Sequence, residues 1–290
     1  MMRLVPVLAT VLASAGALAA CTGSGEEQQQ PPAQESAATA SATAVAAESP
    51  VPQPTETGLA SREASGARAV AEETDDYLFE YKYPAAAGSI AALGSLLDER
   101  LEEQRAELAR SSADARRQAR SDGFPYNKHS YEAEWKIVAD LPDWLSLSNE
   151  FSTYSGGAHG IYGVTSLVWD KEGGEAMEAL DLFTSPQALA DALGDRFCDE
   201  LNTLREQRRG EPVDPSSDDP FNACPDLDET VVLVGSAGGR RFDRLTLYVG
   251  PYVAGPYVEG DWRVNLNVDR QVLEAVKPAY RASFATRNRA

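Results

Sequence analysis

One short stretch of the chain, YSGGAHG at residues 154–160, holds the histidine best suited to acid–base chemistry, His159. A catalytic histidine needs a group that orients its ring and a nucleophile or bound water within reach. Tyr154 and Ser155 stand nearby, but no nucleophile-elbow pattern surrounds them. Glycines permit a positive φ, so a turn between strands, fixed by a histidine–backbone hydrogen bond, is the other interpretation. We favour the turn and keep an enzyme that uses His159 as the alternative.

A second stretch, GPYVAGPYVEG at residues 250–260, places two tyrosines beside rigid Pro/Gly turns. Exposed rings on such turns lose little entropy on binding and make good contact surfaces for a glycan or a protein. The same rings, together with Trp262, are also able to fill a core, and both interpretations stay open. The candidate ligand-binding residues are Tyr154, Gly156, Gly157, His159, Tyr252 and Tyr257, and no catalytic residue is assigned.

Metal and cofactor sites have little support in the sequence. Only two histidines occur, His129 and His159, and neither has a paired ligand spacing. The aspartates between residues 214 and 228 lack the alternation and glycine of an EF-hand, which favours a solvated loop. The glycines between residues 235 and 239 are not followed by the GK[ST] of a phosphate loop. We therefore predict neither a metal nor a cofactor.

The first 20 residues have the layout of a secretory signal, with Arg3 before an apolar stretch that is too short to span a bilayer. An apolar residue and two small ones precede Cys21, which resembles the bacterial lipobox. In that motif the cysteine is diacylated and becomes the new N-terminus. An ordinary cleaved signal with a chance cysteine is the alternative. We expect an exported lipoprotein, held to a membrane by lipid on Cys21 and facing the periplasm or the cell exterior.

The chain has three cysteines, so lipid on Cys21 leaves Cys198 and Cys224 as an even pair. Disulfides persist in exported domains, and we predict a bond between Cys198 and Cys224. It would close a loop of about 25 residues and stabilise the fold by about 3 kcal/mol on the chain-entropy model. Two buried free thiols are the alternative.

Residues 21–72 form the expected tether behind Cys21. Ala, Ser, Thr, Gln, Glu and Pro dominate this stretch, and such a composition buries too little apolar surface to order the chain. About 50 flexible residues have an r.m.s. span of about 40 Å. Two intimate subdomains are expected after it, at residues 73–172 and 173–290, because nearly all the aromatic residues lie there.

Hydrophobic periodicity defines the elements that position the candidate residues. Leucines recur at helical spacing through an amphipathic helix of about 25 residues that follows a short strand. Two alternating segments lead into YSGGAHG, and a β-branched strand leaves it. In the second half, Ser185 and Pro186 mark a helix start that carries Cys198, and Asp269 is suited to cap a last helix. The strands are expected at residues 77–83, 131–137, 145–151, 161–169, 231–234, 245–249 and 264–268. The class is α+β, with antiparallel sheets and helices packed on one face.

The order of several motifs resembles a known pair of bacterial domains. These motifs are Tyr83-Pro84, YSGGAHG, Trp169-Asp170, the LDLF of residues 180–183 and the tyrosine–proline turn. The pair is similar to the domains of unknown function in the extracytoplasmic region of the RsiV anti-sigma factors and the N-terminal region of the PdaC deacetylases. The resemblance implies a PdaC-type domain at 73–172 and an RsiV-type domain at 173–290. It also implies an envelope-facing module which, in the RsiV branch, binds lysozyme.

The formal net charge of −19 arises from 45 acidic and 26 basic residues. Such a chain repels nucleic acid and attracts cationic partners, although solubility alone is an equally adequate reason for the charge. We expect a monomeric, non-enzymatic envelope lipoprotein that binds a lysozyme-like muralytic enzyme or peptidoglycan. A cell-wall hydrolase or deacetylase that uses His159, or a structural envelope component, is the alternative.

Overall fold

The computed structural model describes residues 66–214 and 216–287. The expected signal segment, the lipidation site Cys21 and most of the expected tether lie outside the described residues. None of the helices in the described ranges is long and apolar enough to cross a membrane.

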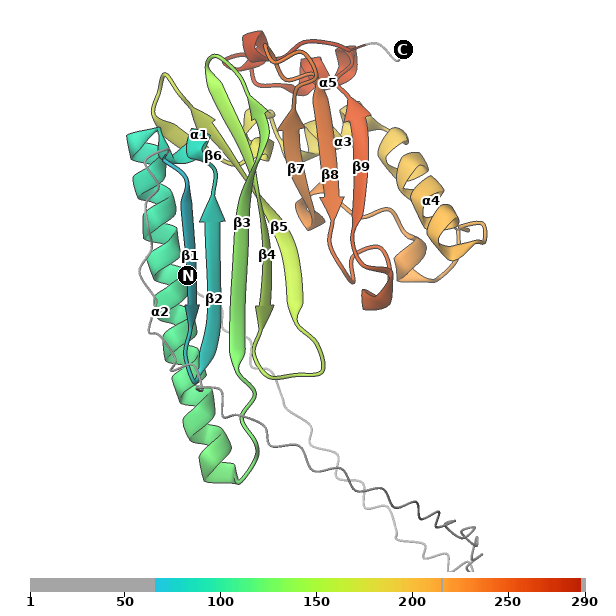
Figure 1. The fold of residues 1–290 in the computed structure, drawn as a ribbon. Helices are drawn as coiled ribbons and strands as arrows, with labels where there is room; N and C mark the ends of the chain where they lie inside the picture. Colours follow the sequence, from blue (N-terminus) through green and yellow to red (C-terminus); the bar gives the residue numbers. More distant parts are fainter. Residues whose placement is uncertain (1–65, 215, 288–290) are drawn as a thin grey trace, which may run out of the picture. The chain divides into compact units, whose positions relative to one another are not determined.

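A six-stranded sheet forms the first half, with its strands in chain order from β1 to β6 (Figure 1). Four of its five neighbouring pairs are antiparallel, whereas β2 and β3 are parallel. The pair is parallel because helices α1 and α2 carry the chain back to the end of the sheet at which β2 begins, and β3 begins at that same end. The expected all-antiparallel pairing is corrected at this one place. The strands are β1 (Arg68–Glu73), β2 (Tyr77–Tyr83), β3 (His129–Asp140), β4 (Trp144–Tyr154), β5 (Ile161–Asp170) and β6 (Glu175–Met177).

Strand β1 takes up the last residues of the segment that was expected to be tether. Its main chain pairs with β2 along its whole length, from Arg68 opposite Tyr83 to Glu73 opposite Leu78. Val70 is buried in the core, and Arg68 forms an ion pair with Asp98. Strand pairing therefore orders a segment whose own hydrophobicity is low, and the expected boundary at residue 72 is too late.

Helix α2 (Ala91–Asp122) covers one face of the six-stranded sheet, after the single turn of α1 (Ala85–Gly88). Four leucines, at 93, 97, 101 and 108, are buried at the spacing that predicted an amphipathic helix. The helix has 32 residues, more than the 25 expected, and ends at Gly123 with φ +75°. Beneath it, the indole nitrogen of Trp135 donates a hydrogen bond of 2.7 Å to the hydroxyl of Tyr81.

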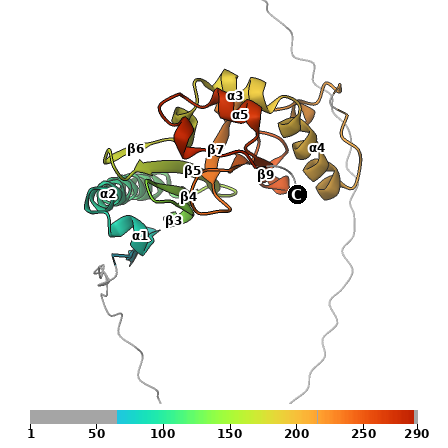
Figure 2. The same ribbon diagram turned by 90° about the horizontal axis from the view of Figure 1, so that it is seen from above.

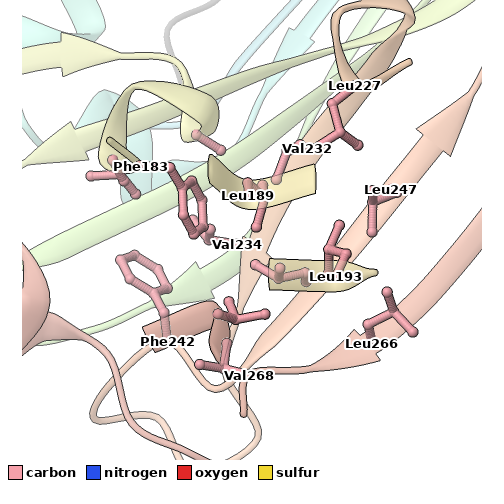
Figure 3. Close-up of a cluster of buried hydrophobic side chains, with 14 of the residues drawn as sticks. Phe183, Leu189, Leu193, Leu227, Val232, Val234, Phe242, Leu247, Leu266 and Val268 are labelled. Atoms are coloured by element: carbon pink, nitrogen blue, oxygen red, sulfur yellow. The ribbon is translucent and has the colours of Figure 1, made fainter. Parts of the chain in front are cut away.

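The second sheet is a three-stranded antiparallel meander of β7 (Thr230–Gly235), β8 (Arg244–Val249) and β9 (Trp262–Asn267). Helices α3 (Pro186–Leu193), α4 (Arg196–Arg209) and α5 (Arg270–Ala275) lie on one side of it (Figure 2). The core between them is aliphatic and aromatic, with Phe183, Leu189, Val234 and Phe242 at its centre (Figure 3). Short 3-10 helices complete the described fold: η1 (Ala179–Leu182), η2 (Pro220–Asn222), η3 (Leu227–Glu229), η4 (Tyr257–Glu259) and η5 (Arg281–Ser283).

Both predicted helix caps are present. The backbone N–H of Ala188 donates to the Ser185 hydroxyl, and that of Val272 donates to the Asp269 carboxylate, each at 3.0 Å. The apolar series that suggested one helix from Ser185 onward is divided into α3 and α4, because Gly194 ends α3 with φ +53°.

The two sheets meet through the face of the second sheet that the helices leave open. Leu233 and Tyr248 pack against Val164 on β5, with Val138 and Val231 at the margin. Trp144 on β4 joins the core of the second half and donates a hydrogen bond to the Ser283 hydroxyl at 2.8 Å. The α+β class predicted from the sequence is confirmed, and the halves share buried side chains across their border.

Candidate functional site

The YSGGAHG stretch is the loop between β4 and β5, and two of its glycines are needed for its path. Gly156 has φ +85°, a region that favours glycine. A Cβ on Gly160 would lie 2.6 Å from the carbonyl oxygen of Thr153, so only glycine fits there. The Tyr154 hydroxyl donates a hydrogen bond of 3.1 Å to the Gly157 carbonyl and closes the loop on itself. Tyr154, Gly156 and Gly157 therefore shape the loop that presents His159.

The tyrosine–proline turn connects β8 to β9 and includes η4. Tyr252 has φ +68° and is the one non-glycine residue with positive φ in the described ranges. This region costs most side chains free energy, and such strain is concentrated at functional positions. The ring of Tyr252 is nevertheless 55 % exposed. A bulky side chain thus stays on the surface at a position whose backbone conformation glycine would adopt at lower free-energy cost.

The loop and the turn meet, although they are far apart in the sequence. The rings of His159 and Tyr257 stack with their centroids 4.0 Å apart and their planes 24° apart. The hydroxyl of Tyr252 lies 3.2 Å from Nε2 of His159, and the Tyr257 hydroxyl donates to the Gly160 carbonyl at 2.9 Å. We refer to His159, Tyr252 and Tyr257 as the aromatic cluster. Tyr162 on β5 adds an edge-on contact to Tyr257 at 5.8 Å.

Both ring nitrogens of His159 are engaged. Nδ1 lies 2.9 Å from the carbonyl oxygen of Gly160, which is only an acceptor, so Nδ1 carries the proton in this contact. Nε2 of the neutral ring then accepts from the Tyr252 hydroxyl. The lone pair that a general base would use is directed at a tyrosine of the same chain. This arrangement fixes the ring as part of a surface.

Exposed aliphatic side chains flank the aromatic cluster. Ile161 directly follows the loop, and Val258, in η4, is 90 % exposed. Together with Tyr252 they make up three of the six large exposed hydrophobic residues described. Clustered exposed apolar side chains mark contact surfaces, whereas scattered ones need no explanation. The two segments therefore form a surface suited to binding.

Three arginines of α4 hold the turn from below. Arg205 is fully buried and donates to the Ala254 carbonyl at 3.1 Å, and burial lowers its pKa to about 10. Arg209 forms an ion pair of 2.9 Å with Glu259, and both side chains are mostly buried. Arg208 stacks on Trp262, 3.7 Å from the ring centre, and donates to the Asp261 carbonyl. The arginines position the turn. Their spacing of three and four residues, which places them on one face of the helix, is the sequence signal by which they could be found.

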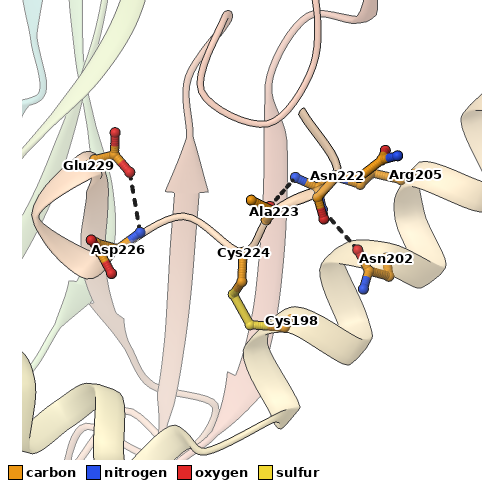
Figure 4. The surroundings of a disulfide bond; sticks show 8 residues. All are labelled: Cys198, Asn202, Arg205, Asn222, Ala223, Cys224, Asp226 and Glu229. Atoms are coloured by element: carbon orange, nitrogen blue, oxygen red, sulfur yellow. Dashed lines mark hydrogen bonds between the residues drawn. A yellow bond between two sulfur atoms is a disulfide. The ribbon is translucent and has the colours of Figure 1, made fainter. Parts of the chain in front are cut away.

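The disulfide ties α4 to the loop that completes these contacts (Figure 4). Cys198 and Cys224, the pair expected from the cysteine count, are bonded with their Cα atoms 5.5 Å apart. The residues just before Cys224 supply carbonyls to Arg205: Asn222 at 3.2 Å and Ala223 at 2.8 Å. The bond thus fixes the helix whose arginines carry the turn.

The remaining candidate residues have structural places. Trp262 is buried in the core, which settles the core-or-contact alternative for that ring. In the acidic loop, the Asp214 carboxylate accepts from Ser216 and that of Asp219 from the Phe221 N–H, as turn residues do. The glycines at 235–239 form the β7–β8 turn, closed by the Ala237 N–H and Asp243. Within the described ranges, no three His, Cys, Asp or Glu side chains are grouped as a metal site requires.

Residues 70–162 match the protein family described as deacetylase PdaC. The matched segment runs from β1 into β5 and includes the loop with His159. The resemblance noted from the motifs is confirmed for this part of the chain, which is a PdaC-like domain. No protein of curated function matches the chain.

Two solved structures of the DUF3298 family are similar to the chain. One, from Bacteroides fragilis, is 18 % identical with a TM-score of 0.42, and the match covers 75 % of this chain and 95 % of that one. The other, from Pseudomonas aeruginosa PAO1, is 16 % identical with a TM-score of 0.40, and the match covers 73 % and 94 %.

Proposed function

We propose that the described domain is a non-enzymatic binding module of the cell envelope, and that the aromatic cluster is its contact surface. The observation that carries the proposal is Tyr252, whose exposed ring sits on backbone with φ +68°. Strain of this kind persists where a side chain is required for function. Aromatic rings held by rigid turns contribute strongly to binding because little freedom is left to lose.

The hydrogen bonds of His159 support binding over catalysis. Its Nδ1 is directed at the Gly160 carbonyl and its Nε2 at the Tyr252 hydroxyl. A general base must reach a proton on substrate or water with a free lone pair. Among the described residues, His159 contacts Gly160, Tyr252 and Tyr257, and none of these is a serine, cysteine or carboxylate that would serve as nucleophile or orienting group.

We propose that the chain is an exported lipoprotein anchored through Cys21. Its proposed partner is a lysozyme-like muralytic enzyme or peptidoglycan. Lysozymes are typically basic, and a net charge of −19 favours encounter with a basic protein. Peptidoglycan offers sugar rings, whose apolar faces stack on aromatic side chains.

The test is a pull-down with the full chain in detergent micelles, against lysozyme and against insoluble peptidoglycan, at low and at moderate salt. We expect salt-sensitive retention of one of these partners. Tyr257→Ala should weaken that retention at least tenfold, because it removes the ring that stacks on His159. Phe124→Ala is the matched control, since Phe124 is an exposed ring outside the aromatic cluster.

Two results would overturn the proposal. If neither partner is retained, the binding function is contradicted. If Tyr257→Ala and Phe124→Ala weaken retention equally, the aromatic cluster is not the contact surface. The enzymatic alternative has its own measurement, the release of acetate or reducing sugar from peptidoglycan. Release that disappears in a folded His159→Ala variant would replace binding by catalysis.

A further inference from the structure

A groove of about 390 Å³ lies beside the aromatic cluster, between the two sheets. Its floor is the face of the six-stranded sheet opposite to α2, from Lys82 on β2 to Val164 on β5. Its wall is formed by Tyr248 on β8 and by Asp261 and Arg263 at the start of β9. This volume is within the range of small-molecule sites.

On the floor of the groove, glutamates of neighbouring strands lie opposite one another. Glu80 lies directly opposite Glu132 in the β2–β3 register, and Glu134 lies directly opposite Glu150 in the β3–β4 register. Like charges directly opposite one another destabilise a sheet. Two such pairs occur side by side, so the sheet carries an electrostatic cost at this place.

The neighbouring cations offset part of this cost. Lys82 pairs with Glu80 at 2.7 Å, and Lys136 pairs with both Glu134 and Glu150. Arg263 contacts Glu150 at 2.9 Å, and the hydrogen bonds from Lys136 and then Arg263 lower the pKa of Glu150. Glu132 forms no ion pair with any described residue. Five acidic but only two basic side chains line the groove, so negative charge remains unmatched there.

Tyr248, which lines the groove, has a buried hydroxyl without a partner among the described residues. Tyr248 is 3 % exposed, and its hydroxyl oxygen has no hydrogen-bond partner among the described residues. Burial raises the pKa of Tyr248, so the group stays protonated and can both donate and accept. A buried polar atom of this kind costs free energy until a partner reaches it. The ring itself is covered by the Arg263 guanidinium at 5.4 Å.

We propose that this groove binds a primary alkylammonium group carried on an aliphatic stem, as in a polyamine or a lysine-type side chain. The ammonium has three donors and meets the carboxylates of Glu132 and Glu134. The stem lies on Tyr162, Val164 and Tyr248, as amphipathic cations lie on apolar surface. A bare metal ion fits less well, because the described carboxylates do not converge in threes.

The site goes beyond the aromatic cluster and does not depend on it. Tyr162 lines the groove and also touches Tyr257, so a large basic partner would span both places. A small amine uses the groove alone. Amine binding and partner retention therefore fail or succeed separately, and Tyr257→Ala should leave amine binding unchanged.

Isothermal titration of the full chain with spermidine and with an acetylated, amidated trilysine peptide tests the proposal at low and at moderate salt. Both probes carry the required group, so binding of either supports it. Tighter binding of spermidine identifies a free polyamine as the natural source, and tighter binding of the peptide identifies a side chain. Mg²⁺ at matched ionic strength is the control for general attraction to an acidic protein. Absence of binding by both amines overturns the proposal.

Substitutions locate the binding in the groove. Glu132→Gln together with Glu134→Gln should lower amine affinity at least tenfold, while the denaturation midpoint stays the same or rises because a like-charge contact is relieved. Tyr248→Phe should lower affinity severalfold with no loss of stability. Glu172→Gln together with Glu175→Gln removes the same two negative charges from exposed positions outside the groove and should leave affinity unchanged. An equal loss with this control pair contradicts the groove as the site.

Discussion

The two histidines of the chain lie on either side of the same loop and have opposite surroundings. His129, at the start of β3, is only 5 % exposed, and its ring forms no hydrogen bond with another described residue. His159, at the far end of the loop, is exposed, yet both of its nitrogens are engaged. A Cβ on Gly156 would stand 3.9 Å from Nε2 of His129, so the loop passes directly over the buried ring.

The difference separates a ring that contributes to stability from a ring that contributes to the surface. A buried ring contributes through packing, and polar contacts are secondary to it. An exposed ring gains little from packing, so hydrogen bonds on both sides serve to hold its face in one orientation. His129 therefore belongs to the support of the loop, and His159 belongs to what the loop presents.

The largest expected effect comes from removing each ring in turn. His129→Ala should lower the free energy of unfolding by about 2–3 kcal/mol, because a cavity opens beside the 170 Å³ pocket that His129 already lines. His159→Ala should lower it by less than about 1 kcal/mol, because water replaces exposed contacts. Urea denaturation of both variants measures the contrast. Equal losses would mean that the two histidines do not differ as described.

A smaller contrast is expected when one tyrosine hydroxyl is removed from the buried core and one from the exposed aromatic cluster. Tyr81→Phe leaves the buried indole N–H of Trp135 without its acceptor and should cost about 1–2 kcal/mol. Tyr252→Phe removes the donor to His159 at an exposed site and should change stability by less than about 0.5 kcal/mol. The same denaturation experiment applies. A cost for Tyr252→Phe as large as that for Tyr81→Phe would assign the cluster to the core.

The smallest effect is a pH dependence. Burial lowers the pKa of His129, so below the unfolded-state value of about 6.5 the unfolded chain binds the proton more readily. Stability is complete above that pH and declines as the pH falls toward the lower folded pKa. The denaturation midpoints of wild type and His129→Gln are measured from pH 7.5 to 5. The decline due to His129 should appear only in wild type. Parallel profiles would contradict it.

The secondary structure was largely predictable because alternation and leucine spacing directly reflect burial. Strand β1 was missed, since only Val70 of its side chains is deeply buried and its order comes from pairing with β2. The parallel pairing of β2 with β3 also escaped prediction, because it depends on where α2 returns the chain. These are properties of the assembled sheet that no local pattern records.

The candidate site was predictable in its members but not in its arrangement. His159, Tyr252 and Tyr257 stand in unusual motifs, which made them candidates, but 93 residues separate His159 from Tyr252. Tyr154 is also a tyrosine and stands in the same motif as His159, yet its hydroxyl bonds within its own loop. Only the packing of the second sheet on β5 decides which tyrosines meet the histidine.

The most direct test of the aromatic cluster as a contact surface is Tyr252→Gly, with stability and partner affinity measured on the same variant. Glycine accepts φ +68° without strain, so the free energy of unfolding should stay within about 1 kcal/mol of wild type or rise. Affinity for the retained partner should fall at least tenfold because the exposed ring is gone. A variant that loses stability but keeps its affinity would contradict the account.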